Sequence, residues 1–201
     1  MLDNEQDSKG EAFLFFGPSG AGKGTQVELL KEYLQQHSDK EIAHLDMGAK
    51  LRSVVKSGQY AGRKIDSIIS KGNFLPGTVP VYFMYDYLME HFRPEMHLLA
   101  DGVVRSAIQV QAFHEAMSFF EHENYKIIFI ELSDESITKR LLARGRNDDT
   151  EEGIKQRIDL YKEQVYPLLD LFESFGKQII HINGEPDIET VHNEIVNKIN
   201  L

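Results

Sequence analysis

Short apolar runs alternate along the chain with longer stretches in which apolar residues recur every three or four positions. The runs that predict strands are Ala12–Phe16, Ile42–Leu45, His97–Ala100, Ile127–Leu132 and Gln178–Ile182. Each is brief and largely apolar, as expected for a strand that is buried on both faces of a sheet.

Between these runs, apolar residues recur with the spacing of amphipathic helices. The predicted helices span Thr25–Gln36, Val81–Phe92, Ala107–Glu121, Glu135–Ala143, Glu151–Phe175 and Ile188–Ile199. Pro80 suits the first turn of a helix, and Gly176 suits a helix end. The alternation predicts an α/β fold, a three-layer sandwich in which a five-stranded parallel sheet is flanked by helices. Ligands of such sheets bind beyond the carboxyl ends of the strands.

The composition is that of an ordinary globular protein. Of the 201 residues, 41% are hydrophobic and 27% are charged, and no apolar run approaches the roughly 20 residues that span a bilayer. The N-terminal stretch MLDNEQDSKGE lacks the basic start and apolar core of a secretion signal. We therefore expect a cytoplasmic protein with no membrane partner, a flexible tail over residues 1–11 and one domain over residues 12–201.

Charge and the absence of cysteine narrow the possible chemistry. The chain has no cysteine, which excludes disulfides, thiol catalysis and cysteine-ligated metals. Its eight histidines form no recognisable ligand spacing, so we expect no zinc. A net charge of -10 argues against non-specific binding to nucleic acid, which needs a broad basic surface. An anionic ligand must therefore meet a local basic cluster.

The sequence GPSGAGKGT at Gly17–Thr25 directly follows the first predicted strand. Glycines let backbone N–H groups turn inward around a phosphate chain, and the helix that follows adds its positive N-terminal end. This is a P-loop, typical of P-loop NTPases, in which Lys23 reaches the β- and γ-phosphates. The predicted ATP-binding residues here are Gly17, Gly20, Ala21, Gly22, Lys23, Gly24 and Thr25. A P-loop alone does not separate a kinase from an ATPase or a switch.

Asp101 ends a buried apolar strand that would lie beside the P-loop strand. A carboxylate there is well placed to hold Mg²⁺ through water, with the Thr25 hydroxyl as a second candidate ligand. The alternative is that Asp101 only forms the turn before Gly102.

A basic segment, KRLLARGR at Lys139–Arg146, contrasts with the acidic remainder of the chain. Arg140 and Arg144 are four residues apart, so they share one helix face and can address one ligand. Asp149 is interpreted as the N-cap of the next helix, with Glu152 completing a capping box. By itself, such a charge run is typical of a solvated helix face.

Several short motifs occur in a specific order and spacing. They are the glycine loop at Gly17–Gln26, a segment ending in LR at Arg52, GxxxP at Gly72–Pro76, DGxxRxxxQ at Asp101–Gln109, RLLxRGR at Arg140–Arg146, and RxxxY at Arg157–Tyr161. In this order they resemble the adenylate kinases, the nucleoside monophosphate kinases that interconvert ATP plus AMP with two ADP. The resemblance runs from Ala12 to about Asn200 and accounts for Gly24 between the lysine and the threonine.

The resemblance implies a monomer that transfers a phosphoryl group from Mg·ATP to a nucleoside monophosphate, with no covalent intermediate. It assigns catalysis to Lys23, Arg105, Arg140, Arg144, Arg146 and Arg157, with Asp148 and Asp149 orienting the arginines. On the ATP side it adds Arg140 and Gly184 to the P-loop residues. On the acceptor side it implies Met47, Gly48, Arg52, Phe74, Leu75, Gly102, Arg105 and Gln109. Arg63 and Arg93 are left as surface residues.

The chain departs from this family at the acceptor base. Met47 stands where a threonine commonly contacts the base, and Gly77 also breaks the family pattern. A thioether packs against a base but reads its polar edge poorly, which loosens the expected preference for AMP. Gln109 favours adenine, because pyrimidine-specific relatives usually carry asparagine there.

The expected lid is very short, because only Gly145 separates Arg144 from Arg146. We therefore divide the domain into a core (12–46, 85–143 and 149–201), an acceptor-binding helical segment (47–84) and a minimal lid turn (144–148). Closure over the substrates would have to come mainly from the acceptor-binding helices, roughly Gly48–Met84, and from this arginine turn.

Three classes of function stay open at this point. The first is a nucleoside monophosphate kinase, with AMP as the leading acceptor. The second is a P-loop kinase acting on CMP, UMP or another small acceptor, and the third is a nucleotide-binding switch without turnover. Arg52 and Arg105, together with Gln109, favour a phosphorylated acceptor that carries a base.

Overall fold

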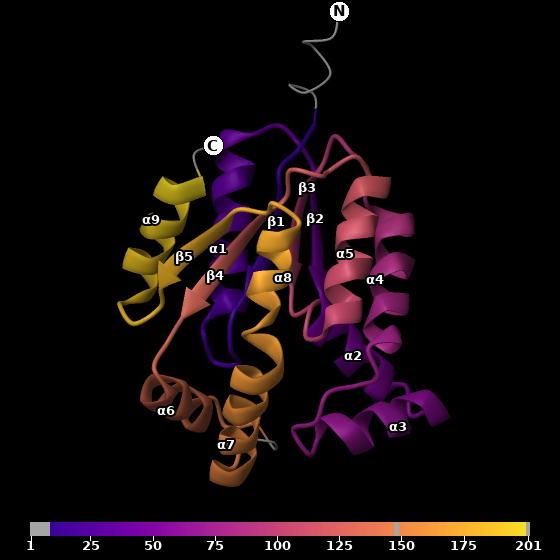
Figure 1. Cartoon of the computed structure of the whole chain (residues 1–201), viewed down its shortest axis with the longest axis vertical. Helices are drawn as coiled ribbons and strands as arrows, with labels where there is room; N and C mark the ends of the chain where they lie inside the picture. Colours follow the sequence, from indigo (N-terminus) through magenta and orange to yellow (C-terminus); the bar gives the residue numbers. More distant parts are fainter. Residues whose placement is uncertain (1–8, 147–148, 200–201) are drawn as a thin grey trace, which may run out of the picture.

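A computed structural model describes residues 9–146 and 149–199 of the chain. Within these residues, five parallel strands form one sheet in the order β2-β3-β1-β4-β5. The strands are β1 (Ala12–Phe16), β2 (Ile42–Asp46), β3 (His97–Asp101), β4 (Lys126–Glu131) and β5 (Ile179–Asn183). Helices cover both faces of this sheet (Figure 1), which confirms the predicted three-layer α/β sandwich.

The helices in the described part of the chain are α1 (Lys23–His37), α2 (Met47–Lys56), α3 (Tyr60–Ile69), α4 (Thr78–His91), α5 (Ala107–Phe119), α6 (Asp134–Arg144), α7 (Glu151–Leu160), α8 (Leu168–Ser174) and α9 (Ile188–Ile199). A π-helical turn, η1 (Tyr161–Val165), joins α7 to the segment leading into α8. None of these helices is long and apolar enough to cross a bilayer.

The sheet buries side chains on both faces because alternate residues of a strand point to opposite sides. Phe13 and Phe15 belong to one apolar cluster with α1 and α9, whereas Leu14 and Phe16 belong to the other, with α4, α5 and α8. All residues of β1 are consequently buried. This two-sided burial explains why the central strands appear in the sequence as continuous apolar runs.

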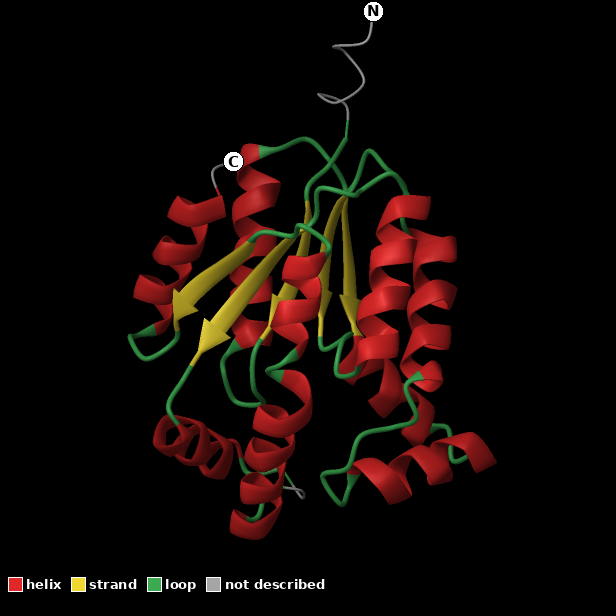
Figure 2. Cartoon of the chain, viewed as in Figure 1, coloured by secondary structure: helices red, strands yellow, loops and turns green. Residues whose placement is uncertain are grey.

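The carboxyl ends of the strands meet at one edge of the sheet, as the arrowheads in Figure 2 show. The register there pairs Asp101 with Phe15 of β1 on one side and with Asp46 of β2 on the other. Helices α2, α3, α6 and α7 lie at this edge (Figure 1). The residues that directly follow the strands, including the P-loop, are therefore brought to the same place.

The prediction of one helix over Glu151–Phe175 is wrong, because α7, η1 and α8 replace it. In η1 the Tyr166 N–H donates to the Tyr161 carbonyl at 2.8 Å, a bond five residues long that inserts an extra residue into the turn. Pro167, which has no N–H to donate, then precedes α8.

The prediction that Asp149 caps α7 is also wrong. Thr150 is the N-cap, and its hydroxyl accepts a hydrogen bond from the Gly153 N–H at 3.1 Å. Asp and Thr are both favoured at the N-cap, so the sequence alone does not choose between these neighbours. In the structure the carboxylate of Asp149 accepts hydrogen bonds from Arg144 and Arg157 instead. Asp148, the other residue predicted to orient arginines, lies outside the described residues.

At the opposite edge of the sheet, residues 9–11 contact the domain. The Gly10 N–H donates to the Pro94 carbonyl at 3.0 Å, and the Glu11 N–H donates to His97 Nδ1 at 2.9 Å. The remainder of the tail predicted over residues 1–11 lies outside the described residues.

Candidate active site

The glycine loop has the backbone that its sequence predicts. Gly17, Gly20 and Gly22 have φ angles of +144°, +86° and +87°, which favour glycine over any residue with a Cβ. A Cβ on Gly17 would also lie 2.6 Å from the Ile130 carbonyl oxygen. Helix α1 begins at Lys23, directly after Gly22, so its N-terminal N–H groups face the loop.

Lys23 lies across the loop, where its Nζ donates to the carbonyls of Gly17 at 3.0 Å and Pro18 at 2.9 Å. Burial lowers the pKa of its ammonium, and the nearby carboxylate of Asp101 opposes that shift. The loop thus keeps a cation directly over its own backbone.

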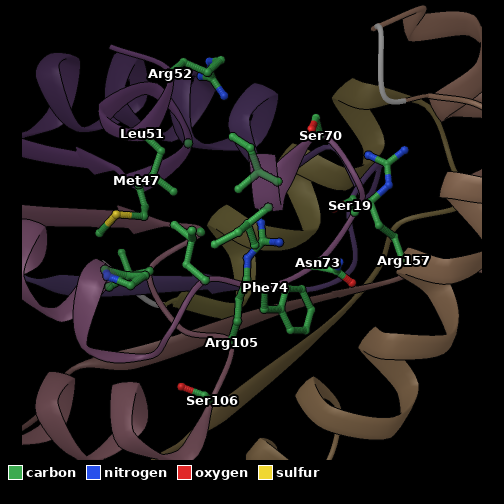
Figure 3. A pocket seen from close by; sticks show the side chains of 18 of the residues that line it. Ser19, Met47, Leu51, Arg52, Ser70, Asn73, Phe74, Arg105, Ser106 and Arg157 are labelled. Carbon is green, nitrogen blue, oxygen red and sulfur yellow. The ribbon is translucent and has the colours of Figure 1, made fainter. Parts of the chain in front are cut away.

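A cavity of about 750 Å³ opens beside the loop. It is lined by every residue predicted on the acceptor side: Met47, Gly48, Arg52, Phe74, Leu75, Gly102, Arg105 and Gln109. Arg144, Arg146 and Arg157 line it as well. Figure 3 shows Arg105 beside Phe74, while Arg157 comes from another part of the chain and extends on the side of Ser19. Residues that are distant in the sequence are therefore gathered around one space.

A much smaller cavity, about 30 Å³, lies against Lys23. It shares Ser19, Phe74, Gly102, Arg105 and Arg157 with the larger one, so both arginines line both spaces. The guanidinium carbon of Arg105 lies 5.5 Å from the centre of the Phe74 ring, within the range of a cation–π interaction. The packing around Arg105 lowers its pKa, against the opposing effect of Asp101; an arginine nevertheless keeps its charge.

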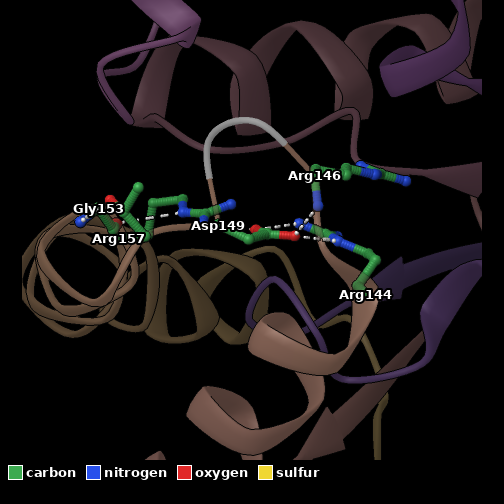
Figure 4. Close-up of polar contacts among 6 residues, drawn as sticks. Arg144, Arg146, Asp149, Gly153 and Arg157 are labelled. Atoms are coloured by element: carbon green, nitrogen blue, oxygen red, sulfur yellow. Dashed lines mark hydrogen bonds and ion pairs between the residues drawn. The ribbon is translucent and has the colours of Figure 1, made fainter.

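The carboxylate of Asp149 holds three segments of the arginine cluster together (Figure 4). Its side chain has no exposed surface. It accepts from Arg144 Nε at 2.9 Å and Nη2 at 2.7 Å, from Arg157 Nη2 at 2.7 Å, and from the Arg146 backbone N–H at 3.1 Å. Burial raises the pKa of this carboxyl, but these hydrogen bonds outweigh it and hold the pKa well below its usual range. Asp149 is therefore a charged anchor.

Arg140 has a different partner from Arg144, although both lie on α6. Its Nη2 donates to the Gly184 carbonyl at 2.8 Å, and its Nη1 lies 4.0 Å from the position of a Cβ on Gly22. Arg140 does not line either of the cavities described above. The structure thus separates the two arginines by partner, Gly184 for one and Asp149 for the other.

The far end of the larger cavity is mostly apolar. Met47 is 1% exposed and Gln109 is 4% exposed. The Gln109 Oε1 accepts from the Arg105 N–H at 2.6 Å, while its Nε2 donates to the Gly77 carbonyl at 3.3 Å. Its amide group is consequently fixed in orientation by the backbone, with one remaining N–H for a ligand.

Asp101 fits the role of a water-mediated Mg²⁺ ligand. Its Oδ1 is buried without a hydrogen-bond partner, and its Oδ2 lies 3.8 Å from the position of a Cβ on Gly24 at the start of α1. Burial raises its pKa, against the opposing charge of Lys23. The described residues contain no cluster of three or more potential metal-ligating side chains. A metal here would depend on phosphate and water for most of its ligands.

Comparison with known proteins agrees with this geometry. The adenylate kinase family profile matches residues 15–177. An adenylate kinase of Prochlorococcus marinus (strain MIT 9211) is 35% identical over 178 residues, which cover 89% of this chain and 91% of that protein. One from Leptospira biflexa is 33% identical over 190 residues, covering 92% and 98%. The chain belongs to the adenylate kinase family.

Adenylate kinases are phosphotransferases, so the chain is an enzyme of that class, a nucleotide-binding kinase. One similar protein, "Adenylate kinase 1" of Nostoc sp. (strain PCC 7120), is 31% identical over 90% of this chain and 95% of its own length. Membership of the family covers nearly the whole described chain, including the P-loop, the cavity and the arginine cluster.

The structure also brings residues to this adenylate kinase site that the sequence did not indicate. Asp46 forms the N-cap of α2 and lies 3.6 Å from Arg52. Gln156 of α7 donates from its Nε2 to Asn73 Oδ1 at 3.0 Å, which joins the acceptor-binding segment to the helix that carries Arg157. The place of Asp46 before a helix was a usable signal. Asn73 and Gln156 carried none, because they are polar residues 83 positions apart.

Proposed function

We propose that this chain catalyses ATP + AMP = 2 ADP, moving the γ-phosphoryl group of Mg·ATP to the phosphate of the monophosphate. The observation that carries the proposal is that Arg105 and Arg157 each line both the acceptor cavity and the cavity beside Lys23. A phosphoryl group transferred between two nucleotides must pass from one such space to the other, and guanidinium groups are suited to its charge.

In this mechanism the protein positions two phosphates in line and neutralises their charge. Lys23 and the P-loop N–H groups hold the donor phosphates, and Arg52 and Arg105 hold the phosphate of the acceptor. Arg144, Arg146 and Arg157 stabilise the group in transit, with Asp149 holding two of their guanidiniums and the Arg146 backbone in place. No covalent intermediate is needed, because the transition state is loose and is stabilised by surrounding cations.

The same proposal includes Mg²⁺, held through water by Asp101 and contacted by the Thr25 hydroxyl. The ion would neutralise negative charge on the donor phosphates. The buried, unpaired Oδ1 of Asp101 supports this role, and no zinc is proposed.

Water must be kept from the phosphates, since it would otherwise accept the phosphoryl group. We propose that residues 47–84 close over the acceptor and that the short turn at 144–148 completes the enclosure. The core (12–46, 85–143 and 149–201) takes no part in this movement. The hydrogen bond between Asn73 and Gln156 supports contact between the two sides of the cavity. We further propose a cytoplasmic monomer that binds neither nucleic acid nor membrane, in keeping with its acidic charge.

AMP is the proposed acceptor because the amide of Gln109 offers an N–H to an acceptor atom of a base. The apolar surroundings, including Met47, offer little to exclude another base. CMP, UMP or another small phosphorylated acceptor is therefore the second candidate.

The test is turnover of Mg·ATP with AMP, CMP, UMP, GMP and dAMP in a coupled assay, beside ATP hydrolysis without acceptor. We expect AMP to give the highest kcat/KM and hydrolysis to be slower by at least about 100-fold. Phosphorylation of another monophosphate in preference to AMP would overturn the acceptor assignment. ATP binding with no phosphorylated product would overturn the proposed function and favour the switch.

A further inference from the structure

The loop between β5 and α9 forms hydrogen bonds with helix α6 at two places. On the main chain, the Gly184 carbonyl accepts from Arg140 Nη2 at 2.8 Å. On the side chain, Glu185 Oε1 accepts from the Ser133 N–H at 2.7 Å and Oε2 accepts from the Ser136 hydroxyl at 2.5 Å. Two consecutive loop residues thus bind both the first turn of α6 and the arginine one turn further along it.

The carboxylate of Glu185 is well matched to the start of this helix. Ser133 is the N-cap of α6, and its own hydroxyl accepts from the Ser136 N–H at 3.2 Å. A negative charge there also interacts favourably with the helix dipole. Hydrogen bonds from Ser136 and Ser133 lower the pKa of Glu185 to about 2, so it is ionised at neutral pH.

The loop itself has little room to move. The Gly184 N–H donates to the Glu131 carbonyl at 2.8 Å, and a Cβ on Gly184 would lie 2.7 Å from that same oxygen. Gly184 is therefore fixed against β4, and Glu185 directly follows it. This rigid base lets the Glu185 carboxylate set the position of α6.

The position of α6 matters for the P-loop and for Arg140. Leu141 of α6 is fully buried, and its Cγ lies 3.0 Å from the position of a Cβ on Gly20. Arg140 lies between Gly22 and Gly184, at the end of the P-loop where the donor nucleotide is proposed to bind. A small rotation of α6 would withdraw its guanidinium from this position.

We propose that Glu185 is a positioning residue for the donor nucleotide, which fixes the start of α6 so that Arg140 stays between Gly22 and Gly184. The inference rests on the proposed function only in taking ATP as the donor. Glu185 itself lines neither of the two cavities described above.

The experiment measures ATP and AMP steady-state constants, and the Kd of Mg·ATP by calorimetry, for Glu185→Ala and for the control Glu189→Ala. Glu189 is an exposed acidic residue in the first turn of α9. We expect Glu185→Ala to raise the KM and Kd for ATP about fivefold to tenfold with the KM for AMP unchanged within twofold. The control should change neither. Ser136→Ala, which removes one partner of the carboxylate, should give a smaller shift in the same direction.

A double-mutant cycle with Arg140→Ala separates positioning from general stabilisation. If Glu185 acts through Arg140, adding Glu185→Ala to Arg140→Ala should change the Kd for ATP less than twofold. Full additivity, an equal rise of both KM values, or no change in Kd would each overturn the inference. If the wild-type protein binds ATP without transferring its phosphoryl group, the proposed function fails, yet the calorimetric Kd still tests Glu185.

Discussion

The arginines around Asp149 and the arginine beside Asp46 are held in opposite ways. Asp149 has no exposed surface and accepts four hydrogen bonds from Arg144, Arg146 and Arg157. Arg52 lies 3.6 Å from Asp46, and the side chains of this pair are 48% and 36% exposed. The first arrangement surrounds a carboxylate that has no exposed surface, and the second is loose and open to water.

This difference matches what each region is proposed to bind. A group in transit is stabilised best by charges that are already in place, because no reorganisation is then needed at the moment of reaction. An acceptor that binds and dissociates in every cycle requires a cation whose side chain can move with it. A buried carboxylate is tolerated at Asp149 because its hydrogen-bonding capacity is largely used, whereas the exposed Arg52–Asp46 pair contributes little to stability.

The largest effect should come from the cation that both regions face. Lys23→Ala removes the ammonium above the P-loop, and we expect kcat to fall by about 1,000-fold, because charge on the donor phosphates would be left unneutralised. Lys56→Ala, at the exposed end of α2, is the matched control. Equal turnover of the two variants in the coupled assay would contradict the role of Lys23.

The next largest effect should come from removing the charge of Asp149, which anchors the arginine cluster. Asp149→Asn removes the charge shared by Arg144 and Arg157, and we expect kcat to fall about 100-fold with a smaller change in the KM for AMP. The free energy of unfolding in urea should fall by about 2 kcal/mol, since hydrogen bonds to a charged acceptor are lost. Asp159→Asn, at an exposed position of α7, is the control. A rise in KM with kcat unchanged would break the comparison between the two regions.

The loosely held side should show the reverse pattern. Arg52→Ala is expected to raise the KM for AMP about tenfold while kcat falls less than threefold, because the lost contact holds the acceptor in all its bound states. Unfolding by urea should change by less than about 0.5 kcal/mol, as for an exposed ion pair. Arg63→Ala, whose exposed side chain donates to the Gly58 carbonyl at 2.5 Å, should leave both constants unchanged.

The smallest expected effect is the pH dependence of the stability that Asp149 contributes. The folded-state pKa of Asp149 lies below its unfolded value, so its ionised form stabilises the fold above about pH 4, and this stabilisation is lost as the pH falls further. The difference in unfolding free energy between wild type and Asp149→Asn should be constant from about pH 5 to 8 and shrink below about pH 4. A difference that grows on acidification would have the wrong sign for this anchor.

The sequence predicted the architecture well, because the signals for strands buried on two faces and for the P-loop are local. Helix α6 ends at Arg144, one residue beyond the predicted Ala143, and its C-cap Gly145 has a φ of +65°, which favours glycine. The role of Glu185 was not predictable in this way, and the arginine-orienting role of Asp149 was expected only from the family resemblance, because its local pattern pointed to a helix cap. Asp149 looks like a cap because its neighbour Thr150 is one, and Glu185 looks like a solvated loop residue because its partners are 49 and 52 positions away.

The break between α7 and α8 escaped prediction for a related reason. A π-helical turn is made from ordinary helix-forming residues, so the apolar spacing passes through Tyr161–Val165 without a marker. Pro167 was the one local warning in that stretch.

The inserted residue of η1 also sets the angular phase between the two halves of this long helical segment. Each residue of an α-helix advances the chain by about 100°. If the same residues formed a regular α-helix in place of η1, the Arg157 half would therefore be rotated by about that angle against the half that packs Leu168, Leu169 and Phe172 into the core. With the extra residue taken up by η1, the apolar side of α8 packs into the core while Arg157 lines the cavity.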